Sequence, residues 1–163
     1  MHATDRNGVT ASAEGDEITR KRCHAPAETD SSLLDGLTPH ELGRVGELIV
    51  ASYLEERGYE ILERGYRCRE GEADLIARDA VEDEIVLVEV KTRRRGRADA
   101  TICPEDAVDA RKRRRYRRIA ACYVQQRTEE RAIRFDVVSV TVSPGNVADI
   151  MHIFDAFDGG DRR

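Results

Sequence analysis

Two short stretches, GEADLIARD at residues 71–79 and EIVLVEVKTR at residues 84–93, decide the fold of this chain. Both are rich in Val, Ile and Leu, and their side chains alternate in the way that places successive residues on opposite faces of a β-strand. Only the four residues 80–83 separate them, which is short enough to close an antiparallel hairpin. The sequence therefore predicts a hairpin at the centre of the fold.

The register of this hairpin brings two acidic residues together. If residues 80–83 form the turn, Asp79 faces Glu84, and Asp74 then faces Glu89 five positions further along each strand. Directly opposed residues in an antiparallel pair have Cβ atoms about 4.5–5.5 Å apart, where like charges repel each other. A shared proton or a hard divalent cation would relieve that repulsion.

Alternation places Lys91 on the same face as Glu89. Two carboxylates and an ammonium group suit metal-dependent hydrolysis of a phosphodiester, in which the metal activates a bound water and the lysine orients it. The alternative is an ordinary solvated ion pair between Glu89 and Lys91, which contributes little to stability. Residue types alone leave both interpretations open.

Five short sequence motifs occur in order around these residues. They are Gly46-Glu47, Gly71-Glu72-Ala73-Asp74-Leu75-Ile76-Ala77, Val88-Glu89-Val90-Lys91-Thr92-Arg93, Arg134-Phe135-Asp136-Val137-Val138 and His152-Ile153-Phe154-Asp155-Ala156-Phe157. Together they resemble the YraN-like family, a bacterial group with an endonuclease-like fold in the PD-(D/E)XK superfamily. The match covers residues 37–157. It departs from the superfamily pattern in one respect, because no proline precedes Asp74.

The resemblance and the strand pattern together predict an α/β, restriction-endonuclease-like fold, with a mixed sheet of four or five strands flanked by helices. They imply an endonuclease that depends on Mg²⁺ or Mn²⁺ and cuts DNA, including structured or branched DNA. Asp74 and Glu89 would bind the metal, Lys91 would position the attacking water, and Glu47 would support the metal or its waters. The alternative is a non-catalytic nucleic-acid-binding module on the same scaffold.

Helices and further strands are predicted on either side of the hairpin. Thr38-Pro39-His40-Glu41 is typical of a helix start with a capping box. Glu47 lies off the apolar stripe of that helix, so it either turns toward a cleft or remains a surface glutamate. Further strands are expected at residues 59–67, 132–142 and 147–157, the first at an edge and the second parallel to strand 84–93.

Positive charge is concentrated in one segment of an acidic chain. The net charge is −5, yet residues 91–118 contain twelve basic and four acidic residues, which favours a basic patch for nucleic acid. A loop after the hairpin carries three arginines that we expect to grip phosphates: Arg93, Arg94 and Arg95. In a helix expected from Pro104, Lys112 either reaches the cleft or extends past the core, and Tyr116 is expected to pack in the core.

The 163 residues suggest one domain. Residues 1–36 are expected to form a disordered leader, residues 37–157 the endonuclease-like domain, and residues 158–163 a frayed tail. The four cysteines lack C-x-x-C spacing and no apolar stretch is long enough to cross a membrane, so we expect a cytoplasmic protein without a membrane partner. A homodimer stays open, since paired cuts on two strands favour two active sites.

Overall fold

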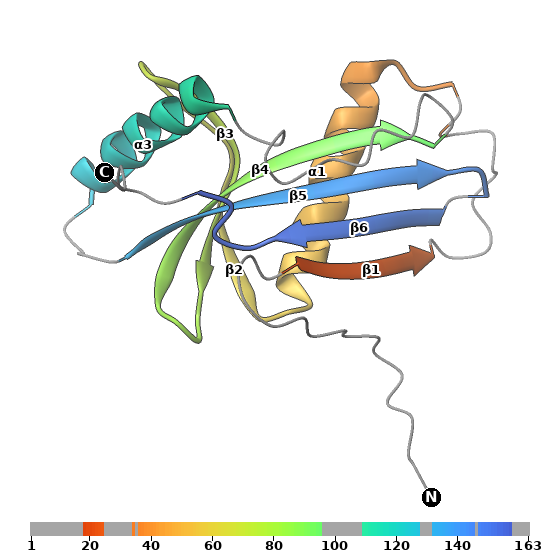
Figure 1. The fold of residues 1–163 in the computed structure, drawn as a ribbon, viewed down its shortest axis with the longest axis horizontal. Helices are drawn as coiled ribbons and strands as arrows, with labels where there is room; N and C mark the ends of the chain where they lie inside the picture. Colours follow the sequence, from red (N-terminus) through yellow and green to blue (C-terminus); the bar gives the residue numbers. More distant parts are fainter. Residues whose placement is uncertain are drawn as a thin grey trace, which may run out of the picture.

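The computed structural model describes residues 18–24, 34, 36–95, 109–127, 132–145 and 147–157, which form a mixed β-sheet with helices on its two faces (Figure 1). The elements in chain order are β1 (Ile18–His24), α1 (Pro39–Glu55), β2 (Tyr59–Cys68), β3 (Gly71–Asp79), β4 (Glu84–Arg94), α3 (Ala110–Gln125), β5 (Ile133–Ser143) and β6 (Val147–Ile153). This arrangement confirms the predicted α/β fold.

The strands lie in the order β1-β6-β5-β4-β3-β2. Neighbouring strands are antiparallel except β4 and β5, which are parallel and are joined through the segment that contains α3. The predicted parallel strand and the predicted edge position of β2 are therefore confirmed. Five strands, β2 to β6, belong to the expected domain, as the sequence indicated.

A sixth strand corrects part of the predicted leader. Residues 18–24 were expected to be disordered, but they form β1, which pairs with β6 from Ile18–Ile153 to His24–Val147. The outer edge of β6 presents backbone groups that need hydrogen-bond partners, and a polar segment can supply them through its own backbone. The rest of the predicted leader, and the predicted tail at 158–163, lie outside the described residues.

The central hairpin has the predicted register. Asp79 faces Glu84, and the ladder between β3 and β4 continues to the pair of Leu75 with Val88. The turn is stabilised by the side chain of Asp79, whose Oδ1 accepts the backbone N–H of Val81 at 3.0 Å.

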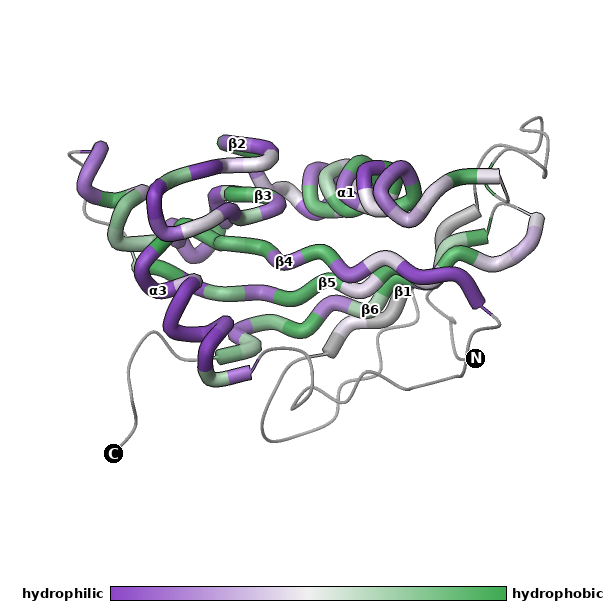
Figure 2. The backbone as a smooth tube through the Cα atoms, turned by 90° about the horizontal axis from the view of Figure 1, so that it is seen from above, coloured by the Kyte–Doolittle hydropathy of each residue, from purple (hydrophilic) through white to green (hydrophobic). Residues whose placement is uncertain are grey.

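The two faces of the sheet bury two apolar clusters, each covered by one helix. Val86 and Val88 of β4 pack on the α1 side, and Leu87 packs on the side that carries α3. Figure 2 shows α1 and α3 on opposite sides of the sheet. Because Glu89 follows the alternation of Leu87, it lies on the α3 face.

Helix α1 begins as predicted and approaches the sheet closely. The Thr38 side chain caps the helix, and the Glu41 carboxylate accepts the backbone N–H of Thr38, which completes the capping box. Further along the helix, a Cβ on Gly46 would lie only 1.8 Å from Oγ1 of Thr92 on β4. Glycine at this position is what allows the helix and the strand to touch.

Two predicted boundaries are wrong. Strand β4 continues through Arg93 and Arg94, which were expected in a loop, because both remain paired with β5. Helix α3 begins at Ala110 rather than at Pro104: Asp109 has an extended backbone and its side chain accepts the N–H of Lys112, so it caps the helix. Residues 96–108 lie outside the described residues. Within the part of the chain that the structure describes, no helix is long and apolar enough to cross a membrane.

Candidate active site

The ladder between β3 and β4 ends just before the two predicted carboxylates. Leu75–Val88 is the last pair, so Asp74 and Glu89 would have formed the next one. Instead, Oδ2 of Asp74 accepts the backbone N–H of Val90 at 2.7 Å. The carboxylate of Asp74 thus replaces a backbone carbonyl of β3 as the acceptor of this N–H group. The two carboxylates lie where the pairing of β3 with β4 stops.

Glu89 is held as an ionised carboxylate by three donors. Its side chain is almost fully buried, and its Oε1 accepts from Lys112 and, at 2.8 Å, from Lys91. Its Oε2 accepts from the hydroxyl of Tyr116. Burial alone would raise the pKa of Glu89, but these hydrogen bonds outweigh it and hold the pKa below its usual range.

Asp74 lies in a different electrostatic environment. Burial and the negative charges of Glu89 and Glu47 raise its pKa to about 6, and the hydrogen bond from Val90 only partly opposes them. Asp74 therefore carries an ionised form that its surroundings disfavour near neutral pH. Such a carboxylate gains more than an exposed one from a cation placed beside it.

Glu47 lies on α1, which covers the face of the sheet opposite to α3. It follows Gly46, the residue at which α1 touches β4, and it is half-buried. Its charge is close enough to act on Asp74. Among the described residues, however, no three His, Cys, Asp or Glu side chains form a group with metal-binding geometry. Glu47 thus contributes charge to the site without completing a three-ligand set.

Lys91 and Lys112 share the carboxylate of Glu89 but differ in their electrostatics. Burial opposes the charged form of Lys91, while its bond to Glu89 raises its pKa. For Lys112, burial lowers the pKa and the positive charge of Lys91 adds to that effect. Of the two alternatives for Lys112, the structure therefore has the one in which the side chain reaches the carboxylates.

The three arginines after Lys91 have protein partners. Arg93 donates to Oγ1 of Thr141 at 3.1 Å, Arg94 donates to the carbonyl oxygens of Leu34 and Leu37, and Arg95 pairs with Asp149 at 3.2 Å. No recorded contact joins these guanidinium groups to Asp74 or Glu89 within the described residues. Their binding to phosphates stays a prediction.

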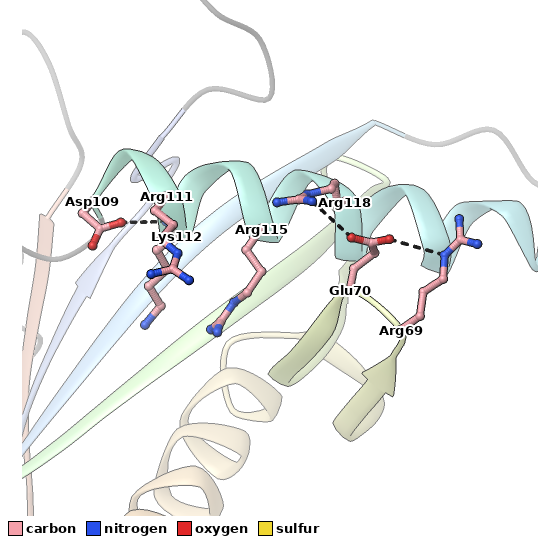
Figure 3. A pocket seen from close by; sticks show the side chains of 7 residues that line it. All are labelled: Arg69, Glu70, Asp109, Arg111, Lys112, Arg115 and Arg118. Atoms are coloured by element: carbon pink, nitrogen blue, oxygen red, sulfur yellow. Dashed lines mark hydrogen bonds and ion pairs between the residues drawn. The ribbon is translucent and has the colours of Figure 1, made fainter.

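Sequence reasoning missed two features of this region. Tyr116 was expected to pack in the core, and it does so at 2 % exposure, but its hydroxyl also holds Glu89. Its position four residues after Lys112 was the available signal, because residues at that spacing share one face of a helix. The second feature is a basic pocket of about 580 Å³ beside Lys112 (Figure 3).

Known proteins similar to this chain carry the same family name. A family model described as the uncharacterised protein family UPF0102 matches residues 46–140. The UPF0102 protein of Syntrophus aciditrophicus is 47% identical over 117 residues, which cover 71% of this chain and 87% of that protein. The UPF0102 protein of Geobacter metallireducens is 43% identical over 118 residues, covering 72% and 92%.

A third relative, the UPF0102 protein of Nocardia farcinica, is 46% identical over 117 residues, covering 71% of this chain and 88% of its own. The family match extends from the glycine at which α1 touches β4 to the middle of β5, and so includes every residue of the predicted site. The chain therefore belongs to the UPF0102 family, the YraN-like group of PD-(D/E)XK-like proteins.

Proposed function

We propose that this protein is a metal-dependent endonuclease that hydrolyses phosphodiester bonds in DNA, including structured or branched DNA. The observation that carries the proposal is the position of Asp74 and Glu89 at the end of the β3–β4 ladder, with Lys91 and Lys112 both bound to Glu89. Buried carboxylates and ammonium groups gathered at one point are costly for stability, and such clusters favour chemistry over packing.

The donor atoms suit Mg²⁺ or Mn²⁺. They are all oxygens, which hard cations prefer. The pKa of Asp74 is raised by burial and by neighbouring negative charge, and a cation would neutralise that charge. Two protein carboxylates are enough for Mg²⁺, because this ion usually keeps several waters and takes its remaining ligands from substrate phosphates. Asp74 and Glu89 would hold the ion, and Glu47 would bind its waters.

Each side chain has a role that follows from its charge. A bound divalent ion would polarise the phosphoryl group and lower the pKa of a bound water. The ammonium group of Lys91, fixed by Glu89, is available to orient the attacking water and to stabilise negative charge on the phosphate. Tyr116 and Lys112 keep Glu89 ionised and fix its orientation, so they are positioning residues.

The alternative proposal is a non-catalytic nucleic-acid-binding module. It is disfavoured by the survival of the whole set of Asp74, Glu89 and Lys91, since a module that only binds DNA has no need of buried carboxylates that repel phosphate. It would be favoured by a protein that binds DNA and never cuts it.

Cleavage of a DNA panel tests the proposal. Linear, single-stranded, flap and four-way-branched DNA, with RNA for comparison, would be incubated with Mg²⁺ or Mn²⁺ and the wild type, Glu89→Gln or Glu72→Gln. Glu72 is an exposed carboxylate on β3 and serves as the matched control. We expect Glu89→Gln to lose at least about 100-fold in rate and Glu72→Gln to retain full activity. Equal cutting by wild type and Glu89→Gln, or no cutting by any protein, would overturn the proposal.

A further inference from the structure

A second cationic feature lies beside the carboxylates. The basic pocket is bounded by the start of α3 on one side and by the turn between β2 and β3 on the other (Figure 3). Seven residues line it, and five of them are cationic: Arg69, Glu70, Asp109, Arg111, Lys112, Arg115 and Arg118. A cavity with this lining has the charge and the size to accept phosphate groups.

The two acidic residues of the pocket do not neutralise it. Glu70 pairs with Arg118 at 3.5 Å and with Arg69 at 3.4 Å. Asp109 accepts the backbone N–H of Lys112 as the helix cap. Within the described residues, neither Arg111 nor Arg115 forms a hydrogen bond or ion pair with a carboxylate. Their guanidinium groups are therefore available for an anion that comes from solution.

The side-chain stem of Arg115 packs against the start of β3. Its side-chain stem lies over Gly71, where an added Cβ would be 3.2 Å from Cδ of Arg115 and 3.3 Å from Cδ1 of Ile119. Gly71 has a φ of +139°, which also favours glycine. The start of β3 thus leaves room for the arginine stem, whose charged end belongs to the pocket lining.

Lys112 joins this pocket to the candidate active site. It lines the pocket and its ammonium group binds Glu89. Residues 111, 115 and 118 recur at intervals of four and three and therefore lie along one side of α3. Seven residues of helix span about 10.5 Å, which equals the rise of about three phosphates of one strand measured along the axis of a DNA duplex.

We propose that the basic pocket is a groove, lined by Arg69, Arg111, Arg115 and Arg118, that holds the sugar-phosphate backbone of a DNA duplex next to the bond that is cut. This inference rests on the proposed nuclease function, because it describes where the substrate strand continues beyond Asp74 and Glu89. The bidentate geometry of guanidinium suits phosphate oxygens, and the contacts are independent of base sequence.

Salt dependence of DNA binding tests the groove without requiring cleavage. A labelled 20-base-pair duplex would be titrated in EDTA with the wild type, the double variant Arg111→Gln/Arg115→Gln and the double variant Arg44→Gln/Arg114→Gln. The second variant removes the same charge, but from exposed positions that do not line the pocket: Arg44 lies on α1 and Arg114 on α3. Thermal melting would check that all three proteins fold.

Two lost phosphate contacts should make the plot of log K against log salt about 1.8 less steep for Arg111→Gln/Arg115→Gln, and leave the slope of the control unchanged. Equal slopes for wild type and the groove variant, or equal losses in both variants, would overturn the groove.

The proposed groove and the proposed nuclease activity can be rejected independently. If the salt slope of Arg111→Gln/Arg115→Gln changes as expected but the protein never cuts DNA, the groove is supported and the nuclease proposal is rejected. Cutting that depends on Glu89, with binding and cutting unaffected by Arg111→Gln/Arg115→Gln, would retain the nuclease and remove the groove.

Discussion

At the scale of single residues, the candidate site is defined by two carboxylates with opposite electrostatics. Donors hold Glu89 ionised, whereas burial and neighbouring acids disfavour the ionised form of Asp74. Pairs of titratable groups whose surroundings push their pKa values apart are typical of active sites. The difference predicts a measurable dependence of stability on pH.

Asp74→Asn should become more stable relative to wild type as pH rises. The pKa of Asp74 is about 6 in the folded protein and 3.8 for the unperturbed group, so the native state binds more protons between these values. Its stability therefore falls as pH rises through this window, by up to about 3 kcal/mol. Asparagine does not titrate and retains an oxygen that can accept from Val90.

Urea unfolding of both proteins in EDTA, from pH 4 to 8, measures this difference. We expect the free energy of unfolding of Asp74→Asn minus that of wild type to increase up to about pH 7 and then to level off. A difference that is constant with pH would show that the pKa of Asp74 is not raised.

At the scale of the elements, the contact between α1 and β4 brings Glu47 toward the strands. Gly46→Ala should destabilise the protein, because its new Cβ would lie 1.8 Å from Oγ1 and 2.8 Å from Cβ of Thr92, so rotation of the threonine cannot relieve the overlap. Such overpacking costs about 1–3 kcal/mol.

Gly43→Ala on the same helix is the matched control. No atom lies within 4 Å of the Cβ that this substitution would add. Because alanine is the better helix former, Gly43→Ala should raise the free energy of unfolding by about 0.5–1 kcal/mol. Equal effects of the two substitutions in chemical denaturation would argue against a close contact between α1 and β4.

The hairpin and the register of its carboxylates could be predicted because a four-residue turn and strict alternation leave one arrangement of β3 against β4. Strand β1 could not, because ITRKRCH lacks an apolar face and pairs with β6 through backbone bonds that sequence does not reveal. The spacing of Lys112 and Tyr116 indicated that both lie on one face of α3, but it did not indicate the bond from Tyr116 to Glu89, since the placement of α3 across the sheet depends on tertiary packing.

At the scale of the whole molecule, a buried network joins β5 and β6 to the rest of the sheet. Asp136 is 1 % exposed and accepts from Arg134 at 3.0 Å, from the backbone of Asp155 at 3.0 Å, and contacts Nε2 of His152 at 2.9 Å. Arg134 also donates to Tyr59 at 2.8 Å. These contacts give a structural reason for two of the five family motifs, those at residues 134–138 and 152–157.

Asp136→Ala should be strongly destabilising. It removes the buried carboxylate shared by Arg134, His152 and the backbone N–H of Asp155. Arg134 keeps its ion pairs with Asp79 and Glu84, but breaking such a buried charged network costs about 3–5 kcal/mol. Glu72→Ala, which removes an exposed carboxylate paired with Arg67, should change stability by less than about 0.5 kcal/mol. Urea unfolding compares the two, and a small effect of Asp136→Ala would mean that the network is dispensable.

Charge is also divided at this scale. Four basic residues of α3, namely Arg111, Lys112, Arg115 and Arg118, line a groove on the face of the sheet that carries Glu89, while the chain as a whole has a net charge of −5. A local basic groove on an acidic body would attract a polyanion to one face and not to the rest of the surface. In the proposed nuclease, Asp74 and Glu89 would then need a cation before a phosphate could approach them.

Thermal melting with and without Mn²⁺ tests most directly whether Asp74 and Glu89 form one metal site. The proteins are wild type, Asp74→Asn, Glu89→Gln and the exposed control Glu72→Gln. Binding to the native state alone would stabilise wild type and the control by about 2.7 kcal/mol at a Mn²⁺ concentration of 100 Kd. We predict that stabilisation and that either site substitution abolishes it; an equal Mn²⁺-dependent shift in all four proteins would contradict the assignment of the site.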